Sequence, residues 1–378
     1  MHDFRAFVHS DCGGHGSRSS CPGGHDSAPP EDAPCGTPND AALLRWTAHC
    51  VLGTIVRFHQ GDHRFWLRPN GTLAAARSYL TMRHALAPSL IAAGRTLQRA
   101  GFPLTARCDL LWPAHAAEGA RDPTQYVHLN ATLVAPLDVE PTDKVSNSRS
   151  VWVPPGDWID GWSGASVRGP RTINVTQPAD KIPMWHKAGA VLVTDGTAAR
   201  WGREEEEEES SARKPLRLVH QQWSELTIEA FPAAGAWRER RDVYEQEGSA
   251  AAAAAAVAAA ATAAPTTVEL RTFGNGTVAV SVSGSPVPRA WVVRLHLRPG
   301  QRLALLARSS SSSSSSSLAA VAGGGRVEHL LPAADCAESY FPFRGAGARP
   351  ACEAGAVAEF RLPSSAVARR IEATIEEH

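Results

Sequence analysis

The sequence lacks any excess of charge of one sign. Its 378 residues carry 38 Lys and Arg against 38 Asp and Glu, which gives a formal net charge of zero. A neutral balance gives no support for a nucleic-acid partner or for binding to an acidic membrane surface. The chain also lacks a long hydrophobic run, because the alanine tract at 250–264 is too short and too weakly hydrophobic to span a bilayer. We therefore expect no nucleic-acid partner and no membrane partner.

A recognisable signal peptide is also missing, because the start MHDFRAFVHSDCGG has neither a basic beginning nor an apolar core. Four N-glycosylation sequons are nevertheless present, at Asn70, Asn130, Asn174 and Asn275. A secretory or extracellular location explains them, and so does chance, because a sequon is a short pattern. The location is left open between these two explanations.

Cysteine is scarce and is not arranged as in a metal site. There are seven cysteines, an odd number, and no CxxC occurs, so a zinc site of the usual spacing is unsupported and no cofactor is expected. Cys336 and Cys352 stand alone near the C-terminus and could pair with each other. The seven positions are Cys12, Cys21, Cys35, Cys50, Cys108, Cys336 and Cys352.

Several segments have too little complexity to build a core. They are a Gly, Ser, Pro and Cys-rich stretch at 13–38, the glutamates at 204–209, the alanines at 250–264 and the serines at 309–317. None carries a core-forming pattern, so each is predicted to be a loop or a linker.

Up to about residue 100, strand and helix patterns alternate. FRAFVH at 4–9 and TIVRFH at 54–59 predict strands, and NDAALLRWTAHCVLG at 39–53 predicts a helix capped by Asn39 or Asp40. The order strand, helix, strand, helix implies that the strands pair in parallel.

Residues 72–100 predict one long helix that comes after the second strand. Pro88 should kink it, and Gly101 should end it. Its leucines, at 80, 86, 90 and 97, have apolar helical spacing and should face a neighbouring layer.

After residue 102 the pattern changes to short strands separated by Pro, Gly and Asp, which is typical of antiparallel sandwiches. The clearest strands are YVHLNATLVAP, VWVP, TINVT and AVLVT. Beyond residue 213 the pattern resumes in LRLVH, LTIEAF, TTVELRTF, GTVAVSVSG and AWVVRLHL. A second all-β domain is therefore expected there.

The stretch VWVPPGDWIDGWSG at 151–164 concentrates aromatic residues and turn formers. Its first residues predict a strand, and Pro-Pro-Gly and Asp-Gly predict turns. We expect Trp152, Trp158 and Trp162 to pack in the sandwich, with stacking on a sugar as the alternative.

Read in order, several stretches resemble the C-terminal part of glycoside hydrolase family 31, the α-glucosidase and α-xylosidase family. The similarity covers roughly residues 1–248 in the family's order and spacing. It is carried by HSDCGGH, LLRWTAHCVLGTIVRFHQGDHRFW, SYLTMRHALAPSLIAAGRTLQRAGFPLTARCDLLWP, LNATLVAPL, the 151–164 stretch, PADKIPMWHKAGAVLV and LTIEAFPAAG…RDVYEQEG.

The resemblance implies a fold of class α/β plus all-β. Residues 1–101 would be the C-terminal fragment of a (β/α)8 catalytic barrel, namely its last two βα units. Residues 102–200 would be a proximal β-sandwich, 201–214 an acidic linker, and 215–378 a distal β-sandwich with low-complexity Ala and Ser insertions. A complete barrel needs about 250 residues, so a partner is implied, the missing barrel portion of a longer chain.

The same resemblance implies a retaining α-glycosidase that hydrolyses α-glucosides or similar sugars. Such enzymes use two carboxylates about 5–5.5 Å apart. In the family these precede the SDCGGH turn, and no segment here resembles them. The isolated chain is therefore predicted to be inactive, with no catalytic residue of its own.

What remains is one wall of a sugar pocket. By resemblance, Asp11 and His59 line the pocket for the terminal sugar, and the carbohydrate substrate is the expected partner. A carboxylate and an imidazole suit sugar hydroxyls, because the first accepts hydrogen bonds and the second donates or accepts them. His15 and Arg57 are candidates for the pocket rim. For Asp11 and His59 a purely structural role is the alternative.

A function from a different class is also consistent with the sequence. The β-sandwiches could be a non-catalytic carbohydrate-binding or structural module. The missing carboxylates favour this for the isolated chain, whereas the family resemblance favours an enzyme.

Overall fold

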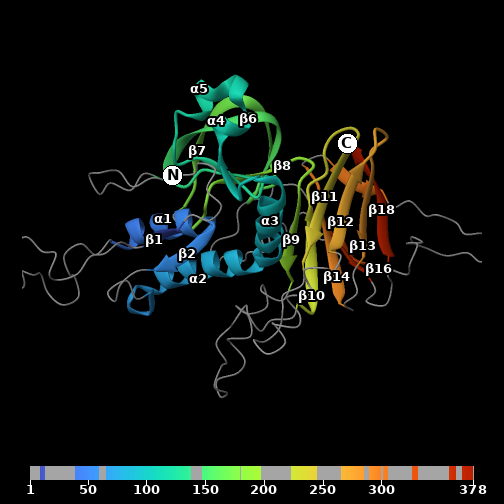
Figure 1. Ribbon diagram of the computed structural model, residues 1–378, viewed down its shortest axis with the longest axis horizontal. Helices are drawn as coiled ribbons and strands as arrows, with labels where there is room; N and C mark the ends of the chain where they lie inside the picture. The colour runs from blue at the N-terminus through green and yellow to red at the C-terminus, as the bar shows by residue number, and fades with distance from the viewer. Residues whose placement is uncertain are drawn as a thin grey trace, which may run out of the picture.

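The structure is a computed structural model. It describes residues 9–12, 39–58, 65–137, 147–178, 180–196, 223–244, 265–284, 289–298, 301–304, 326–330, 357–362 and 368–377. The four low-complexity segments, the predicted strand LRLVH, and Cys336 and Cys352 lie outside these ranges. In Figure 1 the blue helices and strand pair, the green sheet and the yellow-to-red sheets form three neighbouring parts.

The first part is a parallel strand pair with a helix between its strands. Strands β1 (His9–Cys12) and β2 (Ile55–Phe58) pair in parallel, as predicted, and helix α1 (Asp40–Val51) connects them in sequence. Asn39 caps α1, because its Oδ1 accepts a hydrogen bond from the Ala42 amide at 2.8 Å. Most of the predicted strand 4–9 lies outside the described residues, and the described strand includes Asp11 rather than ending before it.

The single long helix predicted for 72–100 is in fact two helices, α2 (Asn70–Ala85) and α3 (Ala87–Ala100), after a 3₁₀ turn η3 (Phe65–Leu67). Pro88 explains the break, because it has no amide hydrogen and its ring clashes with the preceding turn. Gly101, with φ of 70°, ends α3 as predicted. No helix in the described ranges is long and apolar enough to cross a bilayer.

The expected leucine face packs on the core in part. Leu86 is buried, and Leu80 and Leu90 are partly buried and pack against the same core cluster. Helix α2 packs on α1 through mostly small residues, because a close approach of two helices leaves little room for branched side chains. The buried positions of α2 are Thr72, Ala75, Ala76, Tyr79, Met82 and Ala85.

The second part is one antiparallel sheet that curls over its own core (Figure 1). In spatial order its strands are β3 (Thr105–Arg107), β4 (Tyr126–His128), β5 (Thr132–Val134), β8 (Met184–Lys187), β6 (Ser148–Asp160) and β7 (Ser166–Thr176). Short helices cover one end: α4 (Cys108–Leu111), η4 (Pro113–His115) and α5 (Ala116–Gly119). Leu133, Val151, Val153 and Trp158 are fully buried within this sheet, so it has a core of its own.

Strand β6 contains the aromatic stretch and corrects one detail of its prediction. Pro154 and Pro155 do not make a turn, because β6 runs on to Asp160 with a register shift between Val153 and Gly156. The Asp-Gly turn is confirmed: Asp160 Oδ1 accepts hydrogen bonds from the amides of Trp162 and Ser163 at 2.9 and 2.7 Å.

Two of the three tryptophans of this stretch are buried, as expected, and Trp162 is partly buried against the core. Trp158 is fully buried and donates from Nε1 to the carbonyl of Pro154 at 2.9 Å. Trp152 is 8% exposed, and Trp162 donates from Nε1 to the carbonyl of Ile182 at 2.6 Å. Their main contacts are therefore with the protein itself.

The third part consists of two five-stranded sheets that enclose a common core. The first contains β16 (Arg326–Leu330), β17 (Val357–Leu362), β14 (Ala290–His296), β10 (Glu225–Ala230) and β9 (Val191–Asp195). The second contains β11 (Trp237–Val243), β12 (Thr266–Thr272), β13 (Thr277–Ser283), β18 (Ala368–Glu377) and β15 (Gln301–Ala304). Trp291 and Val293 from the first and Leu270 and Val280 from the second meet in this core.

Two features of the third part differ from the antiparallel pattern and the grouping of strands expected from the sequence. Strands β10 and β14 pair in parallel, although the other pairs in both sheets are antiparallel. The strand AVLVT was grouped with the proximal sandwich, but as β9 it pairs with β10 of the third part. One sheet therefore contains strands from both sides of residue 200, the predicted end of the proximal sandwich. The domain limits themselves stay predictions.

Candidate functional site

The parallel pair β1–β2 brings two of the predicted site residues side by side. In the register of the pair, Asp11 lies opposite Arg57, and Cys12 lies opposite Phe58. Arg57 is exposed. His59 and His15 lie outside the described residues, so their placement and the sugar-binding role of all four remain predictions.

A disulfide that was not predicted fixes the end of β1 on helix α1. It joins Cys12 to Cys50 across 38 residues of sequence, with the two Cα atoms 6.3 Å apart. Both cysteines are buried. With seven cysteines and no characteristic spacing, sequence reasoning had no signal to select this pair. The bond holds the strand that carries Asp11 against the helix behind it.

Arg83 of helix α2 fixes the start of β2. Its guanidinium donates to the carbonyls of Val51 and Gly53 at 3.0 and 2.7 Å and to that of Thr54 at 2.8 Å. Burial lowers the pKa of Arg83 from its ordinary value. These carbonyls end α1 and lead into β2, so the charged side chain of Arg83 takes the place of a C-terminal cap.

The segment with His59 is anchored on both sides. Phe58 and Phe65 meet edge to face with ring centroids 4.8 Å apart, so the two flanks of residues 59–64 lie together. Farther on, Arg68 pairs with Asp40 at the start of α1 at 2.9 Å. The structure thereby holds both ends of this predicted pocket segment close to α1.

The described residues contain no group of three or more His, Cys, Asp or Glu that could hold a metal ion. A role of Asp11 and Arg57 in hydrogen bonding to a ligand stays a prediction. Carboxyl and guanidinium groups recognise hydroxyl-rich ligands.

A second arrangement of polar groups lies on the green sheet of the second part. A hollow of about 440 Å³ is lined by Glu118, Arg121, Asp122, Pro123, Thr124, Ser150, Trp152 and Thr172. Six of these eight residues have polar side chains, and Trp152 supplies the aromatic part. Such a lining matches the chemistry of a sugar ring, with hydroxyls at its edge and C–H groups on its faces.

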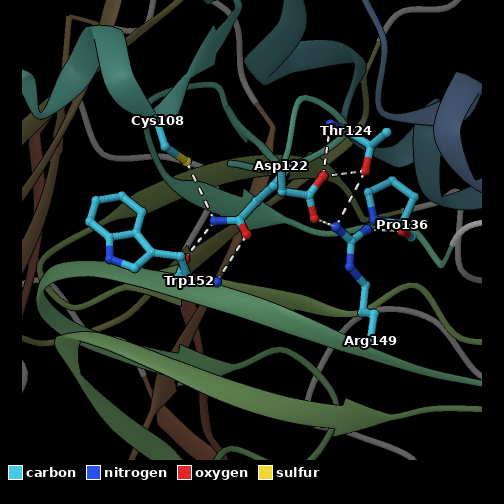
Figure 2. A network of polar contacts seen from close by, with 7 residues as sticks. Cys108, Asp122, Thr124, Pro136, Arg149 and Trp152 are labelled. Carbon is cyan, nitrogen blue, oxygen red and sulfur yellow. Dashed lines mark hydrogen bonds and ion pairs between the residues drawn. The ribbon is translucent and has the colours of Figure 1, made fainter. Parts of the chain in front are cut away.

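Arg149 of β6 braces one side of this hollow (Figure 2). It forms an ion pair with Asp122, donates to the Pro136 carbonyl, and donates to Thr124 Oγ1 at 3.3 Å. Asp122 Oδ1 also accepts from the Thr124 amide at 2.9 Å and from its hydroxyl at 2.7 Å. Burial lowers the pKa of Arg149 to about 10, which leaves it charged at neutral pH.

Gln125 supports the side of the hollow that Trp152 lines. Its Nε2 donates to the Trp152 carbonyl at 2.5 Å, and its Oε1 accepts from the Trp152 amide at 3.1 Å. Its Nε2 also lies 3.5 Å from the sulfur of Cys108, whose thiol pKa is raised to about 12 by burial. Cys108 is consequently a protonated core residue and no nucleophile. Hydrogen bonds and an ion pair thus hold Asp122, Gln125 and Trp152 beside the hollow.

A buried aromatic stack joins the second and third parts. The ring of Phe231 lies between His186 of β8 and His296 of β14, at 4.3 Å from each ring centroid, with interplanar angles of 21° and 14°. All three residues are fully buried. No signal in the sequence predicts this stack, because its three rings lie far apart in the chain and form no local pattern.

Polar partners hold both imidazoles of the stack. His186 Nδ1 lies 3.0 Å from Thr132 Oγ1, and His296 Nε2 lies 2.6 Å from Glu229 Oε2. Burial, with a smaller contribution from His296, keeps the pKa of His186 well below its usual range. The neutral His186 therefore acts as part of the junction between the two β parts.

Comparison with known proteins points to one family. The family description "Glycosyl hydrolase family 31 C-terminal domain" matches residues 110–192. The 1,6-alpha-glucosyltransferase of Sporosarcina globispora is 25% identical over 171 residues, which cover 43% of this chain and 13% of that protein. The isomaltosyltransferase of the same organism is 28% identical over 123 residues, which cover 32% of this chain and 11% of that protein.

Among solved structures, the family 31 dextranase of Flavobacterium johnsoniae complexed with isomaltotriose is similar over 89% of this chain and 37% of that chain, with a TM-score of 0.59 and 18% identity. At this identity the match shows a shared fold. Residues 110–192 are the part that matches the C-terminal domain of glycoside hydrolase family 31, and the curated relatives are similar to the chain over 123 and 171 residues.

Proposed function

We propose that the chain is the C-terminal portion of a retaining α-glycosidase that acts on α-glucosides. In this proposal β1 and β2 are the last two strands of a (β/α)8 barrel, and α1 and α2 belong to its outer layer. The nucleophile and the acid/base come from barrel segments outside these 378 residues. The names of the two curated relatives and the isomaltotriose of the dextranase complex support an α-linked glucoside as substrate.

The observation that carries the proposal is the parallel register of β1 and β2. Active sites of (β/α)8 enzymes lie at the carboxyl ends of their parallel strands. Asp11 and Arg57 are opposite each other one residue before those ends, and Phe58 leads directly to His59. We assign Asp11 and His59 to the pocket of the terminal sugar, and His15 and Arg57 to its rim.

Activity of the isolated chain tests the assignment of roles. Hydrolysis with retention needs one ionised and one protonated carboxyl group on either side of the scissile bond. We expect residues 1–378 alone to give no turnover of a chromogenic α-glucoside or α-xyloside. Turnover that is lost in Asp11→Asn would overturn the proposal, because it would make Asp11 catalytic.

The polar hollow of the second part favours a second function, non-catalytic carbohydrate binding. Glu118 and Arg121 stand at its wall with the hydroxyls of Ser150 and Thr172, over the braced Asp122–Arg149 pair. A sugar bound there would accept from the guanidinium and donate to the carboxylate. This function needs no upstream segment.

Calorimetric titration of residues 1–378 with isomaltotriose separates this second function from the first. Binding that weakens at least about 10-fold in Arg121→Ala, as expected for loss of a charged hydrogen bond, would support the hollow as a sugar site. Arg168→Ala is the matched control, because Arg168 is exposed and pairs with Asp157 on another part of the sheet. Equal weakening in both variants, or no binding at all, would remove this function.

A further inference from the structure

Most asparagines of this chain belong to N-glycosylation sequons. There are six asparagines, and four of them, at 70, 130, 174 and 275, precede one small or aliphatic residue and then Thr. Ser and Thr fill about one position in seven, so chance would give about one sequon among six asparagines. The excess needs an explanation beyond composition.

The structure supplies the second observation, because all four sequon asparagines are exposed. They are distributed over all three parts of the fold: Asn70 begins α2, Asn130 lies in the β4–β5 turn, Asn174 lies on β7, and Asn275 lies in the β12–β13 turn. Strand β7 is an edge of its sheet. A glycan is bulky and needs open solvent, which each of these places provides.

The disulfide gives a third, independent observation. Cys12 and Cys50 are bonded and buried. Disulfides persist in secretory and extracellular compartments and are rare in the reducing cytosol. We infer that the chain passes through an oxidising secretory lumen and carries N-linked glycans at Asn70, Asn130, Asn174 and Asn275.

The chemistry is a glycosyl transfer from a lipid diphosphate-linked oligosaccharide. The bond from sugar C1 to the phosphate oxygen breaks, a bond from C1 to the asparagine Nδ2 forms, the amide loses one proton, and the lipid diphosphate leaves. At Asn275 the side-chain Oδ1 accepts from the Thr277 amide at 3.1 Å, so the product amide keeps this contact while Nδ2 carries the sugar.

Folding constrains when the transfer occurs. Thr132, the hydroxyl residue of the Asn130 sequon, is 4% exposed and contacts His186 in the folded protein. Thr72 of the Asn70 sequon is also buried. Sequon recognition at these two sites therefore precedes folding, whereas the finished glycans lie outside the folded surface.

One glycan would stand beside the polar hollow. Asn174 is the register partner of Ser150, which lines the hollow, and it is two residues from Thr172 on the same face of β7. The glycan on Asn174 would narrow access to the hollow, so the titration with isomaltotriose requires protein made without glycans.

The test is mass spectrometry of the protein purified from the cells that make it. Peptide N-glycosidase in heavy-oxygen water converts each glycosylated asparagine to labelled aspartate. We expect the label at all four sites and none at Asn147, an exposed asparagine that precedes Ser and Arg. A digest without the enzyme corrects for spontaneous deamidation at the two Asn-Gly pairs. An asparagine that is found unlabelled and without sugar is not glycosylated, and its position leaves the proposal. If all four asparagines are found in that state, the inference is overturned.

A variant pair at one site separates glycosylation from an effect on folding. Thr277→Ser keeps the sequon at Asn275, and Thr277→Ala destroys it. In a host that glycosylates proteins in its secretory lumen, we expect Thr277→Ala alone to lose one glycan increment of mass. An unchanged mass in Thr277→Ala would contradict glycosylation of Asn275, and Thr277→Ser shows whether the position tolerates substitution.

Discussion

The parallel strand pair and the curled antiparallel sheet are built in opposite ways. In the curled sheet, Val151, Val153 and Trp158 of β6 are fully buried, and the strand is 13 residues long. In the pair, β2 has four residues, and its Ile55 is 42% exposed. The curled sheet has a core of its own. The strand pair is fixed by a disulfide and by Arg83, and helices α1 and α2 beside it share a second apolar core with the curled sheet.

This difference agrees with the proposal that the strand pair belongs to a larger barrel, whereas the antiparallel parts do not. Parallel strands are ordinarily buried on both faces, because their crossover helices cover the sheet. A two-stranded parallel sheet with an exposed isoleucine is thus an element that gains from further strands, which supports its assignment to a larger barrel. The antiparallel parts complete their cores within the chain. Substitutions in each part should therefore differ in their effects on stability.

The largest loss of stability is expected from Trp158→Ala. The side chain is fully buried, and its removal leaves a large cavity, so the free energy of unfolding should fall by about 3–5 kcal/mol. Urea unfolding monitored by circular dichroism measures it. Trp66→Ala is the control, because Trp66 is 71% exposed and should change stability by at most about 0.5 kcal/mol. Similar losses in both variants would contradict the self-contained core.

The next effect is expected from removing the disulfide in the double variant Cys12→Ser, Cys50→Ser. Closing a loop between residues 38 apart restricts the unfolded chain, and its loss should cost about 2–4 kcal/mol. Hydrogen exchange should place the loss in β1, β2 and α1, with the curled sheet still protected. Exchange that rises equally everywhere would mean that the two parts do not differ in their dependence on this bond.

The pH dependence of stability should reveal the buried stack. The pKa of His186 is depressed in the folded state, so the unfolded chain binds a proton at higher pH than the folded one does. The contribution of the neutral His186 to the free energy of unfolding is complete above about pH 6.5 and is lost as the pH falls below that value. Thermal unfolding at pH 7.5 and 5.5 should show a decrease that is smaller in His186→Gln. An equal decrease in the variant would contradict this role. Burial lowers the pKa of His49 in the same direction, so some dependence will persist.

The smallest effect is expected from Ile55→Thr in β2. The side chain is partly in solvent and Thr is a good strand former, so the free energy of unfolding of the isolated chain should change by about 0.5 kcal/mol or less. In a longer protein with the neighbouring barrel strands, the same change should cost about 1–3 kcal/mol, because the position becomes buried. Equal small costs in both forms would contradict the barrel assignment of β2.

Local patterns predicted much of the fold. The cap at Asn39, the parallel order of the first two strands, the strand at Val151 and the end of α3 at Gly101 all depend on neighbouring residues, and all were found. The errors occurred where residues adjacent in sequence do not determine the local structure. Pro88 was read as a kink but separates two helices, and Pro154 and Pro155 were read as a turn but lie in a strand whose partners hold it extended.

Fewer features of the candidate site could be predicted from the sequence. The motif around Asp11 and His59 could be recognised, but the disulfide behind Asp11 and the Arg83 contacts join residues about 30 or more positions apart. The stack of His186, Phe231 and His296 exists only after two sheets have met. Such contacts depend on tertiary packing, which periodicity and spacing do not describe.

One measurement tests the central claim most directly: kcat/KM on a chromogenic α-glucoside for a longer form of the protein that includes the barrel portion with the two carboxylates. We predict that Asp11→Asn lowers kcat/KM about 10–100-fold, because a charged hydrogen bond to the sugar is lost. The matched variant Asp157→Asn, which removes only the pair with the exposed Arg168 on the curled sheet, should stay within about twofold of the parent. Equal values for the two variants would contradict the placement of Asp11 in the sugar pocket.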